Sequence, residues 1–478
     1  MTASVNQVLN SSDHWAKLFN AQRLGSHKKA PAEDSARSSF HKDYDRLVFS
    51  HSFRQLNQKT QVHPLTNQLG IHTRLTHSLE VSCIGRSLGI MAAEKLHDKL
   101  DGGLPNGVAP ADVGVIVQAA CLAHDIGNPP FGHAGEYAIR DWFMHPERQK
   151  VLHNLSSNEQ LDLLAYEGNA QGFRILARNE HHPDLGGMRL TCATLGAFMK
   201  YPWLATHSNL IYQDSSIYQG SLTTNMQKFG CFYSEAAQLE ELAACLHLPR
   251  SEKHDGFARH PLAYLLEAAD DICYALIDLE DGINLNMLSY AEVAAIFYEL
   301  IGERPDTLNL PTHVSVRQHL ASLRARAMMR LVNAVTDAFV ANSNAMLAGT
   351  LQGSLFAHCD ATVQSGITQA KQLAREKIFN HPSKVRMELM ANQCLQRLLD
   401  AFMPLAWTNE TSASITQMSF EQQRLLKLLQ PHLDEHRRVL SDDTYDNMLN
   451  VLDFITGMND HEAYRLAQEL QGHWGTIV

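Results

Sequence analysis

One stretch in the first third of the chain most constrains its folding, because an apolar helix there ends directly on two polar residues. Its apolar residues recur at helical spacing: Val113, Ile116, Val117, Ala120 and Cys121. This pattern predicts a buried helix over residues 112–124. The helix closes on His124 and Asp125, and a loop rich in glycine and proline follows over residues 126–136. An imidazole and a carboxylate at a buried helix end are costly unless something pairs with them. A bound metal ion is the leading hypothesis for this pair, and a hydrogen-bonded helix end without metal is the alternative.

Four further stretches carry apolar residues at helical spacing and predict helices. They cover residues 76–100, 261–281, 316–344 and 422–429. Pro261 suits the first turn of its helix. No alternation of apolar and polar residues is long enough to predict a large sheet. We therefore expect an all-α fold, with a helical core and a helical C-terminal extension.

The length of the chain suggests more than one structural part. At 478 residues, 45% of them apolar, it exceeds what a single hydrophobic core usually serves. We expect an N-terminal polar segment over residues 1–40, since residues 25–39 are small and polar. A core that carries the motifs should cover residues 41–290, and a helical C-terminal region packed on that core should cover residues 291–478.

Composition argues against several classes of protein. The formal net charge of −11 does not suit a broadly basic nucleic-acid-binding protein. No apolar run reaches the roughly 18–20 residues of a membrane span, and the first ten residues lack the pattern of a secretion signal. The eight cysteines show no CxxC spacing, which favours reduced thiols and a cytoplasmic location. The 26 histidines direct attention to metal chemistry.

Two other polar residues join His124 and Asp125 as candidate metal ligands. His77 lies near the start of a predicted helix, where a solvated histidine is the alternative. Asp270 lies within an apolar helix, where a carboxylate needs a partner and a divalent cation supplies one. Two imidazoles and two carboxylates suit Mn²⁺, Fe²⁺, Co²⁺ or Ni²⁺, or Mg²⁺ with more water. Open coordination positions would hold a phosphate oxygen and water, as in a hydrolytic Lewis-acid site.

Helical spacing places further polar side chains beside one another. His133 and Glu136 share one side of a turn, where a carboxylate can orient an imidazole for general acid–base catalysis. The alternative gives both residues a supporting role around the metal. Asp270, Tyr274 and Asp278 form one stripe of one helix, which is a candidate sugar-binding edge. The alternative there is a core tyrosine and a solvated aspartate.

Three motifs stand out together: RLTHSLE over residues 74–80, HDIGNPPFGHAGE over 124–136 and EAADDICY over 267–274. Shorter characteristic stretches lie at residues 58–62, 167–172, 195–202, 278–281 and 453–460. In this combination and order the chain resembles the bacterial dGTP triphosphohydrolases of the HD superfamily. The matching stretches run from about residue 45 to 470, so the resemblance covers most of the chain.

The resemblance assigns roles to individual residues. The four metal ligands of the family fall on His77, His124, Asp125 and Asp270, and its catalytic pair falls on His133 and Glu136. Its sugar contacts match Gln55, Tyr274 and Asp278. Its triphosphate contacts match Arg74, Lys200 and Lys228, with Tyr201 beside them.

The resemblance also implies a reaction and partners. The expected reaction is hydrolysis of a deoxynucleoside triphosphate, with dGTP preferred, to the deoxynucleoside and intact inorganic triphosphate. The expected cofactor is a divalent metal, Mn²⁺ or Mg²⁺ first, with iron, cobalt or nickel as alternatives. A homo-oligomer, hexameric by resemblance, is expected. A dNTP effector and regulation by single-stranded DNA stay open, although no basic stripe in the sequence supports the latter.

Two other functions fit part of the pattern. An HD phosphomonoesterase or cyclic-nucleotide phosphodiesterase could use the same metal site, but Arg74, Lys200 and Lys228 exceed what a monophosphate needs. A nucleotide-sensing scaffold without activity could dispense with His133 and Glu136, which this chain keeps. The chain departs from the family pattern at Asn459, where Thr is common, and at Glu462, where an aromatic residue is expected.

Overall fold

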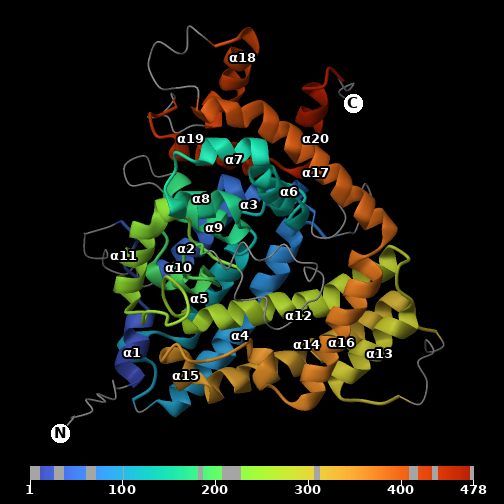
Figure 1. Ribbon diagram of the computed structural model, residues 1–478. Coiled ribbons are helices and arrows are strands. Elements are labelled where there is room, and N and C mark those ends of the chain that lie inside the picture. The colour runs from blue at the N-terminus through green and yellow to red at the C-terminus, as the bar shows by residue number, and fades with distance from the viewer. Residues whose placement is uncertain are drawn as a thin grey trace.

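The computed structural model describes residues 11–25, 37–60, 72–100, 102–180, 187–206, 228–305, 313–407, 418–432 and 440–473. Over these ranges the chain forms twenty α-helices and no β-strand, with only isolated β-bridges between loops (Figure 1). The expected all-α fold is confirmed. The eight cysteines are all free.

The first half of the chain contributes eleven helices. They are α1 (Ser11–Leu18), α2 (Ser39–Phe49), α3 (His51–Gln55), α4 (Arg74–Lys99), α5 (Pro110–Ala123), α6 (His133–Met144), α7 (Pro146–Leu152), α8 (Ser157–Leu164), α9 (Gly168–Arg174), α10 (Cys192–Phe198) and α11 (Ala236–Leu246). A π-helical turn over Ile175–Asn179 continues α9.

The second half contributes nine more. They are α12 (Pro261–Asn284), α13 (Tyr290–Ile301), α14 (Val316–Ala341), α15 (Ser343–Leu347), α16 (Ala361–Ala374), α17 (Pro382–Phe402), α18 (Phe420–Leu429), α19 (Thr444–Gly457) and α20 (Asp460–Glu469). All five stretches predicted from periodicity are helical here, and most of their ends agree to within about three residues. The prediction over residues 316–344 divides into α14 and the start of α15.

Local chemistry explains where the central helices begin. The side chain of Thr73 accepts a hydrogen bond from the backbone N–H of Thr76 and so caps α4. Proline occupies the first position of both α5 and α12, where its missing N–H costs nothing. The helices α4 and α5 pack tightly against each other, and a Cβ added at Gly89 of α4 would lie 2.8 Å from the backbone of Gly114. Because α12 packs on both, the three helices bring their polar residues to one place.

Two hydrophobic clusters fill the interior. The first surrounds α4, α5 and α12 and includes Phe297 of α13 and Phe339 of α14. It also takes in Trp15 of α1, so this part of the expected polar segment packs into the core. The second joins α6 and α8 to α17 and α19. The boundaries at residues 40 and 290 stay predictions, and the first cluster runs across both.

None of the helices in the described ranges combines the length and the apolar character needed to cross a membrane. The cytoplasmic location and the homo-oligomer stay predictions.

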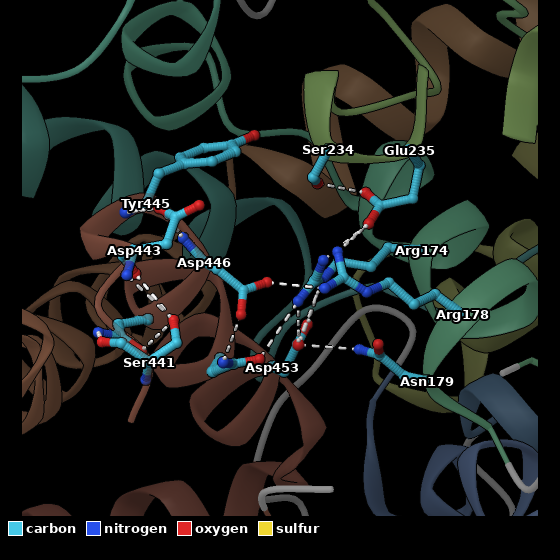
Figure 2. Close-up of polar contacts among 12 residues, drawn as sticks. Arg174, Arg178, Asn179, Ser234, Glu235, Ser441, Asp443, Tyr445, Asp446 and Asp453 are labelled. Atoms are coloured by element: carbon cyan, nitrogen blue, oxygen red, sulfur yellow. Dashed lines mark hydrogen bonds and ion pairs between the residues drawn. The ribbon is translucent and has the colours of Figure 1, made fainter. Parts of the chain in front are cut away.

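A buried ion-pair network fixes the C-terminal helices to the core. The Arg174 side chain is 1% exposed, and its guanidinium lies 2.9 Å from Asp453 of α19 and 2.7 Å from Glu235. Arg178, at the next turn, pairs with Glu235 and with Asp446 of α19 (Figure 2). The helices α18, α19 and α20 gather at the end of the molecule opposite α14 and α15. The network therefore connects this end to α9.

Replacing Arg174 with Ala should destabilise the protein strongly, because Asp453 and the fully buried Glu235 would lose their main partner. Breaking a buried pair in this way costs about 3–5 kcal/mol. Arg178→Ala is the matched control, since its side chain is 25% exposed and Glu235 would keep Arg174 as a partner, so the loss should be smaller. Urea unfolding followed by circular dichroism measures both. Equal, small losses in the two variants would contradict this account of the network.

Candidate functional site

Four candidate metal ligands converge from three helices. His77 lies in the first turn of α4, His124 and Asp125 follow the end of α5, and Asp270 lies midway along α12. The ligand atoms of His77, His124 and Asp125 all lie within 4.8 Å of one another. Asp270 completes the group, with Oδ1 at 3.2 Å from His77 Nε2 and 3.5 Å from His124 Nε2. The structure thus brings together all four predicted ligands.

The orientation of His124 suits a ligand. Its Nδ1 lies 2.7 Å from the carbonyl oxygen of Cys121, so Nδ1 carries the proton and donates it to this acceptor. The lone pair of a neutral imidazole is then on Nε2, which faces Asp125 and Asp270. A hydrogen bond behind a histidine fixes the tautomer in this way at many metal sites.

An unpaired buried oxygen also points to a cation. Asp125 Oδ1 accepts hydrogen bonds of 2.6 Å from both Arg74 and Asn128, whereas Oδ2 is buried and has no hydrogen-bond partner among the described residues. A buried carboxylate oxygen without a partner is expensive. Two imidazole nitrogens and two carboxylates are donors that divalent transition metals and Mg²⁺ accept. The residues present therefore fit a divalent metal ion.

Neighbouring cations keep the two carboxylates ionised. Burial alone would raise the pKa of Asp270, but Lys200, at 2.7 Å from Oδ2, and His124 hold it well below its usual range. Burial likewise opposes ionisation of Asp125, and Arg74 is the main group that lowers its pKa. Burial would lower the pKa of His124, yet Asp125 and Asp270 together raise it. Both carboxylates are therefore held in the deprotonated form that a metal ligand needs.

The two side chains of the predicted acid–base pair, His133 and Glu136, contact each other beside this cluster. His133 is the first residue of α6, and its Nδ1 lies 2.7 Å from Glu136 Oε2. Glu136 is buried, and its Oε1 accepts a 2.8 Å hydrogen bond from the backbone N–H of Gly168. Burial would raise the pKa of Glu136, but His133, together with Arg140 and Lys228, lowers it below its usual range. The His133 side chain is 64% exposed, so its imidazole is held from one side and open on the other.

The basic residues expected at the triphosphate fall into two groups. Arg74 and Lys200 lie inside the cluster, each bonded to a candidate ligand. Lys228 lies 4.0 Å from Glu167 and close enough to Glu136 to lower its pKa. Tyr201 is buried, and burial raises the pKa of its hydroxyl.

The three residues that the resemblance assigns to the sugar lie in different surroundings. Asp278 is buried rather than solvated, and burial, with Asp281 and Asp270 nearby, raises its pKa to about 7. Tyr274 is partly buried and stacks on Phe379, with ring centroids 5.7 Å apart. The amide of Gln55 lies 2.9 Å from His51 Nε2, and no described contact joins it to the cluster.

Two residues at the site escaped the sequence analysis. Asn128 binds Asp125, and its position three residues later in the motif could have indicated this. Arg259 donates a 2.6 Å hydrogen bond to the carbonyl of Lys200, pairs with Glu267 one turn before Asp270, and lies over the ring of Tyr201. No local pattern signals Arg259, because its partners come from other segments.

The sequence of this chain is similar to those of known proteins with an HD domain. Residues 74–192 match the HD domain, a range that contains His77, His124 and Asp125 but ends before Asp270. A deoxyguanosinetriphosphate triphosphohydrolase-like protein of Pseudomonas aeruginosa (strain LESB58) is 45% identical over 96% of this chain and 98% of its own length. A like-named protein of Synechocystis sp. is 37% identical over 96% of this chain and 99% of its own length. The deoxyguanosinetriphosphate triphosphohydrolase of Salmonella typhimurium is 32% identical over 83% of this chain and 82% of its own length.

Replacing Asp270 with Asn should weaken binding of Mn²⁺ at least about 10-fold, since even the partners behind metal ligands contribute about 10–100-fold. Asp271→Asn is the matched control, because this neighbour on α12 faces Lys371 at 2.8 Å instead of the cluster. Calorimetric titration of both variants with Mn²⁺ measures the difference. Equal affinities would show that Asp270 is not a ligand.

Proposed function

We propose that this chain, which belongs to the HD-domain family of deoxyguanosinetriphosphate triphosphohydrolases and triphosphohydrolase-like proteins, hydrolyses deoxynucleoside triphosphates. The products would be the deoxynucleoside and inorganic triphosphate, with dGTP the preferred substrate. One observation supports the proposal most: a cluster of four candidate metal ligands has two cations, Arg74 and Lys200, inside it and the candidate acid–base pair beside it.

A metal ion fits the site through His77, His124, Asp125 and Asp270, with Mn²⁺ or Mg²⁺ as first candidates and iron, cobalt or nickel as alternatives. When bound, it would act as a Lewis acid toward a phosphate oxygen and an attacking water. The carboxylates of Asp125 and Asp270 are already ionised, so no proton has to leave them first.

Arg74 and Lys200 would bind the triphosphate. Arg74 is buried and Lys200 is partly buried, and each is bonded to one candidate ligand carboxylate, so both cations are held at the place where phosphate oxygens would enter. The Nε of Arg74 is buried and has no hydrogen-bond partner in the part of the chain that the structure describes, which leaves a donor for an anionic oxygen. Lys228 would add a third positive charge on the side of Glu136. Arg259 would keep Lys200 in place through its carbonyl.

His133 and Glu136 would move the proton. Glu136 accepts from Gly168 and orients His133 through Nδ1, so His133 Nε2 is the atom free to exchange a proton with substrate or water. In the proposed step the oxygen of water bonds to the α-phosphorus and the bond from this phosphorus to the 5′-oxygen breaks. The attacking water gives up one proton to the solvent, the 5′-oxygen takes up one proton from His133 Nε2, and His133 then regains a proton from the solvent.

This arrangement favours triphosphate release over the other two functions. A phosphomonoesterase or phosphodiesterase would not need Arg74, Lys200 and Lys228 together around one metal site. A sensor without activity would not need a buried glutamate that fixes an exposed histidine.

Incubation with each of the four dNTPs, in Mn²⁺ or Mg²⁺, tests the reaction directly. Chromatography should resolve the deoxynucleoside and inorganic triphosphate in equal amounts, most rapidly from dGTP. Tyr274 leaves little room for a 2′-hydroxyl if the sugar stacks on it, so GTP should be a poor substrate. Release of orthophosphate or pyrophosphate, or equal kcat/KM for GTP and dGTP, would refute the proposal.

Removing the acid–base pair should abolish turnover and spare binding. The variants His133→Ala and Glu136→Gln should lose about 10²–10⁴-fold in kcat and keep their metal content and nucleotide affinity. His145→Ala is the matched control, since this exposed histidine follows the other end of α6. Loss of metal from either variant would instead make that residue a ligand.

A further inference from the structure

The loop that joins the metal cluster to the acid–base pair is conformationally strained. It covers residues 126–132, and Phe131 in it has a φ of 66°, which costs a residue other than glycine about 1–3 kcal/mol. Gly132 follows with a φ of 60°, and a Cβ there would lie 2.5 Å from Arg74 Nη2. Since His133 comes next, this backbone fixes where α6 begins. A contact from outside the loop is therefore needed to stabilise this conformation of Phe131.

Asp460 provides that contact from the far end of the chain. The backbone N–H of Phe131 donates a 2.8 Å hydrogen bond to Asp460 Oδ1. Asp460 Oδ2 accepts from the backbone N–H of Thr60 at 3.0 Å and from its hydroxyl at 2.5 Å. The carboxylate is completely buried. Asp460 therefore links Phe131 to Thr60, although Phe131 and Asp460 lie 329 positions apart in the sequence.

Lys59 holds the same loop at a second point. Its ammonium group, on a side chain that is almost fully buried, donates to the carbonyl of Asn128 at 2.8 Å and to that of Thr456 at 2.7 Å. The side chain of Asn128 in turn binds the candidate ligand Asp125. Both contacts tie the loop to the junction between α19 and α20.

The same C-terminal helices also support Glu136. Asp453 of α19 binds Arg174 of α9 (Figure 2). It also accepts a 2.6 Å hydrogen bond from Gln171 of the same helix. The first residue of α9 is Gly168, whose N–H binds Glu136. The helices α19 and α20 thus support both members of the acid–base pair. They support His133 through the contact with Phe131, and Glu136 through the contact with α9.

We infer that Asp460 is a positioning residue for the acid–base pair, and that it acts by holding Phe131, and with it the start of α6, in the strained conformation that places His133. The inference rests on the proposed function. Asp460 touches none of the candidate ligands in the described contacts, and the ligands lie on α4, α12 and the end of α5. Losing it should therefore lower the rate of the reaction and leave metal and nucleotide binding intact.

Three variants test this positioning role. Asp460→Ala removes both acceptors, and Asp460→Asn keeps one oxygen for Phe131 but turns an amide toward the donors of Thr60. Glu462→Gln is the control, because this exposed acid is in the same first turn of α20 and binds only the cap residue Asn459 in the described contacts. The Asn variant should keep a larger part of the activity than the Ala variant.

The readouts are kcat and KM for dGTP, metal content, and amide exchange over residues 126–137. We expect Asp460→Ala to lose about 10–100-fold in kcat, as small misplacements of a catalytic group do, with KM and metal content within about threefold of wild type. Amide exchange at Phe131 should be faster than in Glu462→Gln. An unchanged kcat, or losses of metal and nucleotide affinity as large as the loss of kcat, would overturn the inference.

Amide exchange also separates this inference from the proposed function. If the wild type hydrolyses no dNTP, the proposed function fails, while faster exchange in Asp460→Ala than in Glu462→Gln still supports the hold on the loop. If exchange over residues 126–137 is the same in both variants, the inference fails whatever the wild type hydrolyses.

Discussion

The structure depends on how two carboxylates, the buried Asp125 and the partly buried Asp270, keep their charge between helices. Burying an ionised carboxylate costs several kcal/mol unless partners compensate. Arg74 and Lys200 supply the first compensation, at 2.6 and 2.7 Å, and two imidazoles face the same oxygens. A metal ion would supply the partner that Asp125 Oδ2 lacks in the described part of the chain. This need for compensation explains why Arg74 and Lys200 lie between helices in a protein of net negative charge.

Residues from distant parts of the sequence meet at the site and at the loop over residues 126–132. The HD-domain match stops at residue 192, yet Asp270 on α12 completes the ligand cluster and Asp460 on α20 holds Phe131. The helices after the HD domain are therefore more than a covering of the core. By this account the rate of the reaction depends on contacts made by Asp453 and Asp460, which lie far beyond the end of that match.

Local patterns account for most of what the sequence predicted. The helices around the site follow from apolar periodicity, and the four ligands meet because each lies at a helix end or on a buried helix face. The departures at Asn459 and Glu462 also have a local explanation, since the two side chains bind each other's backbone N–H and cap α20. Lys59 and Asp460 lie in the stretches 58–62 and 453–460 that support the resemblance, but their roles, like that of Arg259, could not be predicted, because they act on residues distant in sequence. Gln55 has a described contact only with His51, although the resemblance placed it at the sugar.

The central claim, that His77 and His124 bind one metal ion with Asp125 and Asp270, can be tested by pulsed electron paramagnetic resonance of the Mn²⁺-loaded protein. The modulation of the electron spin echo reports imidazole nitrogens bonded directly to manganese. The account predicts coupling to two such nitrogens in the wild type and to one in His77→Ala. A wild-type spectrum without a directly bonded nitrogen would contradict it.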